Sequence, residues 1–217
     1  MSTTLGKKIY HIIHWKRLDS VMKAGGLFCD ATMSTSPAAT RTIIGNKQIK
    51  GNRLTLPVNC HEGLCVGGCV PFYFCPRSVM LYVISCGNHP NLAYKEGQNP
   101  IVHLELDLNQ TVQWAEQFGK KWAFTDSNAA ATYVSFFKNL SDINNVPWDD
   151  VKNNSWSDPA VKNGKQSEFL VEQFCPWSLV ERIGVKNQEA YEEVINLLPS
   201  DSSITNPKVE IIPSWYY

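Results

Sequence analysis

Three short segments of this sequence combine polar side chains with residues that favour β-strands. In the first, residues 10–14, side chains alternate between the two faces of an expected strand, so His11 and Ile13 share one face. A histidine there can hydrogen-bond a ribose hydroxyl or a base amide, although a lone histidine in a strand is more often part of the core. This segment therefore has both a ligand-binding and a structural interpretation.

The second segment, residues 71–82, is a compact run of aromatic residues around a turn. The turn carries the charge of Arg77 and the hydroxyl of Ser78, and it is bracketed by Tyr73 and Tyr82. Aromatic residues in strands usually belong to the core. Two tyrosines on either side of a polar turn are also suited to enclosing a flat ring.

The third segment, residues 166–173, is an apolar strand that contains Glu168. A carboxylate among Phe, Leu and Val is costly unless it is paired or faces a cleft. The alternative is that Glu168 is a solvated surface residue, and its apolar neighbours in the sequence argue against that interpretation. Glu168 is thus the strongest single candidate for chemistry.

Hydrophobic patterning indicates which elements position these segments. The order is mixed and contains neither GxGxxG after a strand nor GxxxxGK[ST]. It predicts an α+β fold with largely antiparallel sheets rather than a doubly wound parallel sheet. We expect strands at 7–13, 69–74, 80–86, 101–106, 166–173, 179–185 and 209–212, helices at 15–24, 113–118, 128–140 and 188–198, and long loops at 29–57 and 141–165.

Length and composition are those of one globular domain spanning residues 1–217. No apolar run is long enough for a signal core or a membrane span, so we expect a soluble, cytoplasmic protein without a membrane partner. The net charge is zero, but residues 1–100 hold eleven Lys and Arg against four Asp and Glu, a net +7. This basic half suits anionic ligands such as a pyrophosphate or a nucleic acid strand.

The seven cysteines are expected to be reduced thiols, because the chain is longer than disulfide-stapled domains. Cys60, His61, Cys65 and Cys69 form one cluster of possible zinc ligands. Their spacing lacks a CxxC pair, so the prediction is that no metal binds there.

Together the three segments resemble the His–Tyr–Glu pattern of ADP-ribosyltransferases, and nearly the whole chain resembles the DarT family of DNA ADP-ribosyltransferase toxins. Members commonly carry Thr where this chain has Ile13 and Pro where it has Val79. The resemblance is carried by residues 10–11, the helix and glycine stop at 18–27, and residues 49–53, 70–78, 80–82 and 166–171.

This resemblance implies an ADP-ribosyltransferase-like fold with split sheets and flanking helices. It implies transfer of ADP-ribose from NAD to a base of single-stranded DNA, with thymidine favoured and guanosine possible, and release of nicotinamide. Glu168 is the implied catalytic residue, with Arg53 stabilising the anionic base. The NAD contacts we expect are His11, Ile13, Tyr73, Arg77, Ser78 and Tyr82.

The DNA strand is expected to follow Lys47 and Lys50 with its phosphates and to stack on Trp148 and Trp156, although simple packing is an equal alternative for the two tryptophans. The loop at 141–165 is where related transferases read their targets, so it would set sequence preference. The family also implies a partner, an antitoxin with a macrodomain that removes ADP-ribose from DNA.

Three other functions stay open at this point. The chain could modify RNA or protein with the same NAD site, since only the acceptor would differ. It could be an inactive module that binds NAD or nucleic acid. It could also be a zinc-binding domain built on residues 60–69.

Overall fold

The computed structural model describes residues 6–34, 44–45, 47–90, 92–199 and 206–217. Most of the strands that these residues form follow apolar runs in the sequence. They are β1 (Lys8–His14), β2 (Gly26–Phe28), β3 (Cys69–Tyr73), β4 (Ile101–Asp107), β5 (Trp122–Thr125), β6 (Phe136–Phe137), β7 (Glu168–Glu172), β8 (Phe174–Pro176), β9 (Val180–Val185) and β10 (Lys208–Ile211).

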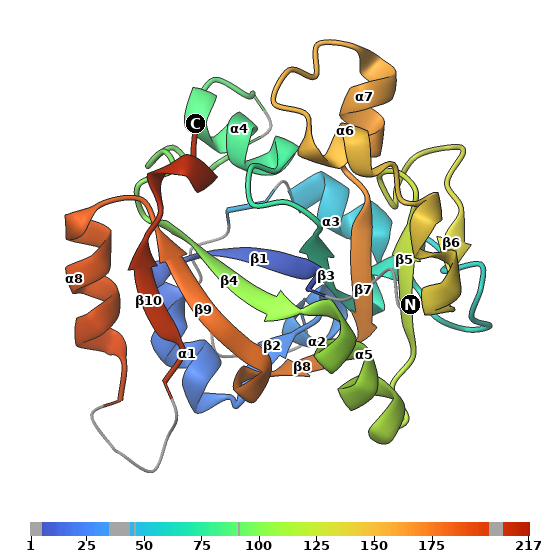
Figure 1. Cartoon of the computed structure of the whole chain (residues 1–217), viewed down its shortest axis with the longest axis horizontal. Coiled ribbons are helices and arrows are strands. Elements are labelled where there is room, and N and C mark those ends of the chain that lie inside the picture. Colours follow the sequence, from blue (N-terminus) through green and yellow to red (C-terminus); the bar gives the residue numbers. More distant parts are fainter. Residues whose placement is uncertain (1–5, 35–43, 46, 91, 200–205) are drawn as a thin grey trace.

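The large sheet has the strand order β10-β9-β4-β1-β3-β7-β5-β6 (Figure 1). All its neighbours are antiparallel except β10 and β9. Strands β1 and β4 pair over seven positions, whereas β1 and β3 meet only at Tyr10 and Tyr73. The two halves of the sheet are therefore joined by a single pair of the backbone ladder, in agreement with the predicted split, largely antiparallel arrangement.

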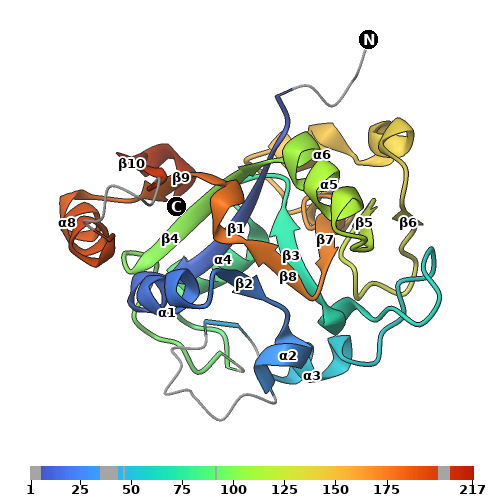
Figure 2. The ribbon, with the colours of Figure 1, turned by 90° about the horizontal axis from the view of Figure 1, so that it is seen from below.

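The helices cover both faces of this sheet. They are α1 (Leu18–Lys23), α2 (Asp30–Ser34), α3 (Lys47–Arg53), α4 (Val79–Cys86), α5 (Leu108–Gln117), α6 (Trp148–Lys152), α7 (Pro159–Gly164) and α8 (Gln188–Leu197). Figure 2 shows α5 and α6 on one side of the sheet and α2 and α3 on the other. Helices α4, α6 and α7 gather near one end of β3 and β7, at the top of Figure 1.

Two predicted elements are wrong. Residues 80–86 form helix α4 rather than a strand. A short apolar run is ambiguous between the two, and here the ends decide, because Ser78 caps the first turn and Gly87 ends the helix in the left-handed conformation, with φ 64°. Residues 128–140 form turns and the strand β6 instead of a helix, because Asn128 bonds the N–H of Ala130 in a turn and the alanine run is too short to propagate.

One helix has a different start from the prediction, and two segments predicted as loops contain helices. The expected helix at 113–118 begins earlier, at Leu108, where Asp107 caps it by accepting from the N–H of Gln110 at 3.0 Å. The expected loops at 29–57 and 141–165 contain four short helices, α2, α3, α6 and α7. Within the described part of the chain, no helix combines the length and the apolar character needed to cross a membrane.

Candidate active site

A carboxylate and a guanidinium meet in a fork at the start of β7. Nη1 of Arg53 donates to Oε1 of Glu168 at 2.9 Å, and Nη2 donates to Oε2 at 2.6 Å. The Glu168 side chain is 5% exposed and that of Arg53 is 12% exposed. Burial disfavours the charge of Arg53, but the carboxylate outweighs it and raises the pKa of the guanidinium above its ordinary value. This residue pair is buried, charged and rigidly oriented.

The Glu168 carboxylate has one further partner and remaining capacity. The backbone N–H of Ala129 donates to Oε1 at 3.3 Å, and the backbone N–H of Glu168 itself donates to the hydroxyl of Thr125 at 2.9 Å. A carboxylate offers about four acceptor sites, and the fork and Ala129 take three. The geometry therefore leaves about one lone pair for a ligand hydroxyl or a proton.

Strand pairing places two tyrosines directly beside this carboxylate. Tyr73 is the cross-strand partner of Glu168, and Tyr10 is the partner of Tyr73 at the join between the two sheet halves. Burial, followed by the negative charge of Glu168, raises the pKa of Tyr73, so its phenol stays neutral.

His11 follows in the same strand and is neutral. Its Nδ1 lies 2.8 Å from the carbonyl oxygen of Pro71, which can only accept, so Nδ1 carries the proton and Nε2 is the acceptor atom of the ring. Burial lowers the pKa of His11 to about 4. At neutral pH the ring therefore offers a lone pair rather than a positive charge.

The turn that carries Arg77 and Ser78 is held by two residues far away in the sequence. Nε2 of His103 donates to the carbonyl oxygen of Pro76 at 2.9 Å, and the Tyr217 hydroxyl donates to the carbonyl oxygen of Arg77 at 2.8 Å. The guanidinium of Arg77 lies over the Tyr217 ring, 4.4 Å from its centre. These contacts fix the position of the turn relative to β4 and the last residue.

Ser78 is fully buried, and its hydroxyl accepts from the N–H of Leu81 at 3.2 Å. A hydroxyl used as an acceptor in a helix cap still has its own proton to donate. Tyr82, one turn further along α4, is 41% exposed and packs edge-on against Trp156 and Tyr217.

His103 makes stability depend on pH. It is fully buried, and burial lowers the pKa of its imidazole to about 4 from the ordinary 6.5. The folded protein disfavours protonation of this ring. The contribution of neutral His103 to the unfolding free energy is therefore present above about pH 6.5 and is lost as the pH falls toward 4. Integrated over that window, the pKa shift corresponds to a loss of roughly 3 kcal/mol of unfolding free energy.

The unfolding free energy, measured with urea at about pH 7 and about pH 5, should fall more steeply for the wild type than for His103→Gln. Equal slopes would contradict this account.

The remaining predicted NAD contact, Ile13, lies in the hydrophobic core rather than at the site. Its side chain is 2% exposed and packs in the main core with Trp15 and Leu18. A ligand cannot touch this side chain without displacing core residues, and Ile13 remains only a prediction from resemblance.

The residues predicted to bind DNA are divided between two places. Lys50 on α3 pairs with Asp30 at 2.6 Å, while Lys47 begins the same helix and its side chain is outside the described part of the structure. Trp148 packs edge-on against Phe74, and its indole N–H donates to the carbonyl oxygen of Ile143 at 3.0 Å. These contacts are compatible with both interpretations of Trp148, as a packing residue and as a surface for base stacking.

The possible zinc cluster has other partners. Nε2 of His61 lies 2.8 Å from the carbonyl oxygen of Trp122, and Sγ of Cys69 lies 3.6 Å from the carbonyl oxygen of Cys65. Among the residues whose placement is described, no three His, Cys, Asp or Glu side chains are grouped as a metal site requires.

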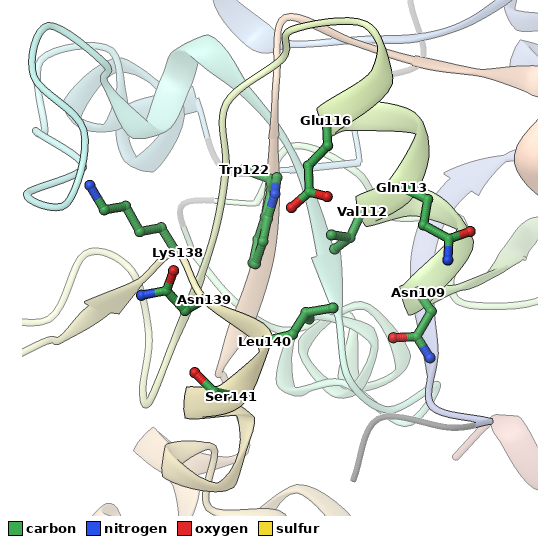
Figure 3. Close-up of a pocket in the computed structure, with 9 residues that line it drawn as sticks. All are labelled: Asn109, Val112, Gln113, Glu116, Trp122, Lys138, Asn139, Leu140 and Ser141. Carbon is green, nitrogen blue, oxygen red and sulfur yellow. The ribbon is translucent and has the colours of Figure 1, made fainter. Parts of the chain in front are cut away.

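A hollow of about 350 Å³ lies away from this chemistry, between α5 and the segment after β6 (Figure 3). Trp122 lines this hollow, together with residues that include Glu116 and Lys138. None of its lining residues is a predicted site residue, so this hollow gives no support to the candidate chemistry.

Several residues that hold the site were missed from the sequence. Ala129 acts through its backbone N–H, which leaves no pattern in the sequence, and the Thr125 hydroxyl accepts from the backbone N–H of a residue 43 positions away. Tyr217 and His103 lie far along the chain from the turn that they support. Asp107, a helix cap, carried a recognisable local signal.

Comparison with known proteins gives a consistent result. The family model for DarT, described as an ssDNA thymidine ADP-ribosyltransferase, matches residues 10–217. A DNA ADP-ribosyl transferase of Thermus sp. (strain 2.9) is 35% identical over 96% of this chain and 95% of its own length, and that of Thermus aquaticus is 34% identical over 96% and 88%.

A solved structure of Thermus sp. 2.9 DarT with ADP-ribosylated ssDNA matches all of both chains with a TM-score of 0.87 and 33% identity. The same protein with NAD+ matches with a TM-score of 0.81 and 33% identity, over 98% of each chain. A DarTG structure from Thermosipho africanus, 16% identical with a TM-score of 0.75, covers 97% of this chain and 51% of its own and shares the fold.

The buried Glu168–Arg53 fork lies beside the His11 and Tyr73 positions of a split sheet, and the matches extend over nearly the full length. The chain belongs to the DarT family of single-stranded-DNA thymidine ADP-ribosyltransferases and is an NAD-dependent DNA ADP-ribosyltransferase.

Proposed function

We propose that Glu168 is the catalytic carboxylate with which this chain moves ADP-ribose from NAD to a thymine base of single-stranded DNA, and that Arg53 acts with it. The observation that carries the proposal is the bidentate pair between the two side chains, buried at the start of β7. Few structural reasons exist to bury such a pair at a strand end, because its desolvation offsets much of its attraction.

Glu168 acts first on the ribose next to nicotinamide. Positive charge grows on this sugar as nicotinamide departs with the bonding electron pair. A fixed carboxylate at the ribose hydroxyls stabilises that charge, and one preorganised group of this kind contributes about 3–4 kcal/mol. The unused lone pair of Glu168 is the acceptor for one ribose hydroxyl.

The other NAD contacts follow from the donors and acceptors around Glu168. The neutral His11 ring accepts from a second ribose hydroxyl through Nε2. Tyr73 and Tyr82 lie against the nicotinamide ring. The bond from Ser78 to the nicotinamide amide rests on the family resemblance alone, because Ser78 is fully buried. Arg77 is the candidate for binding the NAD pyrophosphate, and its alternative ligand is a phosphate of the DNA strand.

The acceptor base has to lose a proton, because a ring nitrogen of neutral thymine is a poor nucleophile. Glu168 takes this proton after nicotinamide has left, and Arg53 stabilises the resulting negative charge on the base. General-base assistance of this kind contributes about 10²–10⁴-fold. The base has to be unpaired to reach Glu168, so a single strand is the substrate.

The acceptor is tested by offering the enzyme and NAD matched polymers of one sequence. A single-stranded DNA with one thymidine should gain one ADP-ribose, measured by intact mass. The same strand with cytidine in place of thymidine, its duplex and its RNA counterpart should gain none. Modification of the RNA or of added protein, with the DNA unchanged, would overturn the proposed acceptor.

We also propose a macrodomain-containing antitoxin as a partner, on the strength of the family resemblance. A macrodomain protein that is encoded with this chain should release ADP-ribose from the modified thymidine strand, detected as loss of the added mass. If the added mass is stable to that protein, this partner is wrong and the transfer reaction is unaffected.

A further inference from the structure

A second pocket, of about 420 Å³, lies at the same end of β3 and β7 as Glu168. It is formed by the first residues of β1, the segment that follows β3, helix α6 and the residue Lys165. Five of its fourteen lining residues are Lys or Arg, and none is Asp or Glu. Such a one-sided charge favours an anionic ligand.

Four of these cations have no carboxylate partner within the described part of the chain. Lys165 is only 2% exposed. Its ammonium donates to the carbonyl oxygen of Val151 at 2.9 Å and to the thiol of Cys75 at 3.7 Å. A buried ammonium normally has a carboxylate partner. This one has only neutral partners among the described residues and therefore stabilises a negative charge in the pocket.

Arg77 and the two lysines at the rim complete the pattern. Arg77 donates to the side-chain oxygen of Asn154 at 3.4 Å, and its buried Nε has no hydrogen-bond partner among the described residues. The ammonium of Lys7 lies 3.6 Å from the centre of the Trp148 ring. Lys7 and Lys152 both line the pocket, and burial, followed by the charge of Lys152, lowers the pKa of Lys7.

By contrast, two other lysines near the site are paired with carboxylates. Lys8, also in the pocket lining, binds Asp107 and Glu181, and Lys50 binds Asp30. Among the described residues that line the pocket, the cations without a carboxylate partner are therefore Lys7, Arg77, Lys152 and Lys165.

The pocket is close to the acceptor position. Tyr10, which lines it, is the cross-strand partner of Tyr73, and Tyr73 is that of Glu168, so these three side chains point to the same face of the sheet. Lys165 precedes Glu168 by three residues, a chain length of at most about 10 Å. A strand whose backbone passes through the pocket can therefore direct one base toward Glu168.

We infer that this pocket, defined by Lys7, Arg77, Lys152 and Lys165, binds the phosphodiester backbone of the single-stranded DNA next to the acceptor thymidine. The inference rests on the proposed function. Single-strand binding sites combine a cationic groove with aromatic surfaces, and Tyr10 and Trp148 supply such surfaces in the lining.

The test uses the full chain with Lys7 and Lys152 both changed to Ala. The control changes Lys23 and Lys208 to Ala, which removes the same charge from side chains that are 76% and 72% exposed elsewhere. We measure kcat/KM for a one-thymidine oligonucleotide at saturating NAD, KM for NAD at saturating DNA, and the affinity for a labelled copy of the oligonucleotide at several salt concentrations.

The Lys7/Lys152 variant should show about a tenfold fall in kcat/KM for DNA and a salt dependence of log affinity that is shallower by about 0.7 for each lost phosphate contact. Its KM for NAD should equal that of the control. Neutral methylphosphonate linkages beside the thymidine should weaken DNA binding by the wild type more than by the variant, because the variant has already lost two of the four cations.

An equal response of variant and control to DNA, or a raised KM for NAD with unchanged DNA kinetics, would overturn the inference; the latter result would assign the pocket to the NAD pyrophosphate. A wild type that modifies no DNA at all would instead contradict the proposed function. The salt-dependent binding of the labelled strand would still decide whether the pocket holds phosphates.

Discussion

Glu168→Gln is expected to lower kcat for ADP-ribose transfer about a thousandfold while leaving NAD binding within a few-fold of wild type. The amide keeps the shape of the carboxylate but carries no negative charge, so it neither stabilises the charged sugar nor removes the thymine proton. Single-turnover transfer to a thymidine oligonucleotide measures the first effect, and the NAD concentration dependence measures the second.

Glu172→Gln is the matched control. It lies four residues along the same strand, and its carboxylate accepts from the backbone N–H of Lys121 at 3.0 Å rather than from Arg53. It should keep near-wild-type activity. Comparable losses in both variants would show that β7 tolerates no change of charge, and the assignment of Glu168 as the catalytic residue would lose its support.

Arg53→Met is expected to destabilise the fold by about 3 kcal/mol or more, because it leaves the Glu168 carboxylate, 5% exposed, without its cation. Transfer activity should fall as well, since the anionic base also loses its partner. Urea unfolding at neutral pH measures the stability loss. The double variant Arg53→Met/Glu168→Gln should recover part of it, because the uncompensated buried charge is then gone.

The control for Arg53 lies one helical turn earlier. Lys50→Met breaks the Lys50–Asp30 pair, whose side chains are 38% and 32% exposed, and such a pair contributes about 0–1 kcal/mol. A loss for Lys50→Met as large as that for Arg53→Met would mean that α3 itself, rather than the buried pair, sets the stability.

The sequence predicts the strands of this fold better than its helices. The runs that became β1, β3, β4, β7 and β9 are long, apolar and bounded by polar residues, so burial alone specifies them. Helix α4 was mistaken for a strand because a short run rich in Val, Ile and Leu is ambiguous between the two, and its identity depends on Ser78 and Gly87 at its two ends. Helices α2, α3, α6 and α7 are too short to show a period of their own.

The candidate site was predicted in part. Glu168 stands out because a charge in an apolar strand needs a partner or a cleft. The resemblance supplied Arg53 only as the stabiliser of the anionic base, and the structure places its guanidinium 2.6 Å from the Glu168 carboxylate. No sequence pattern joins residues that are 115 positions apart. The same limit hides the cationic pocket, because Lys7, Arg77, Lys152 and Lys165 come from four separate segments that only the folded sheet brings together.

The most direct test of the central claim is tandem mass spectrometry of a single-stranded oligonucleotide with one thymidine, after incubation with NAD and either wild type or Glu168→Gln. The account predicts one ADP-ribose with the wild type, located by fragmentation on the thymine base, and none with the variant. ADP-ribose on another nucleotide, or equal modification by both proteins, would contradict it.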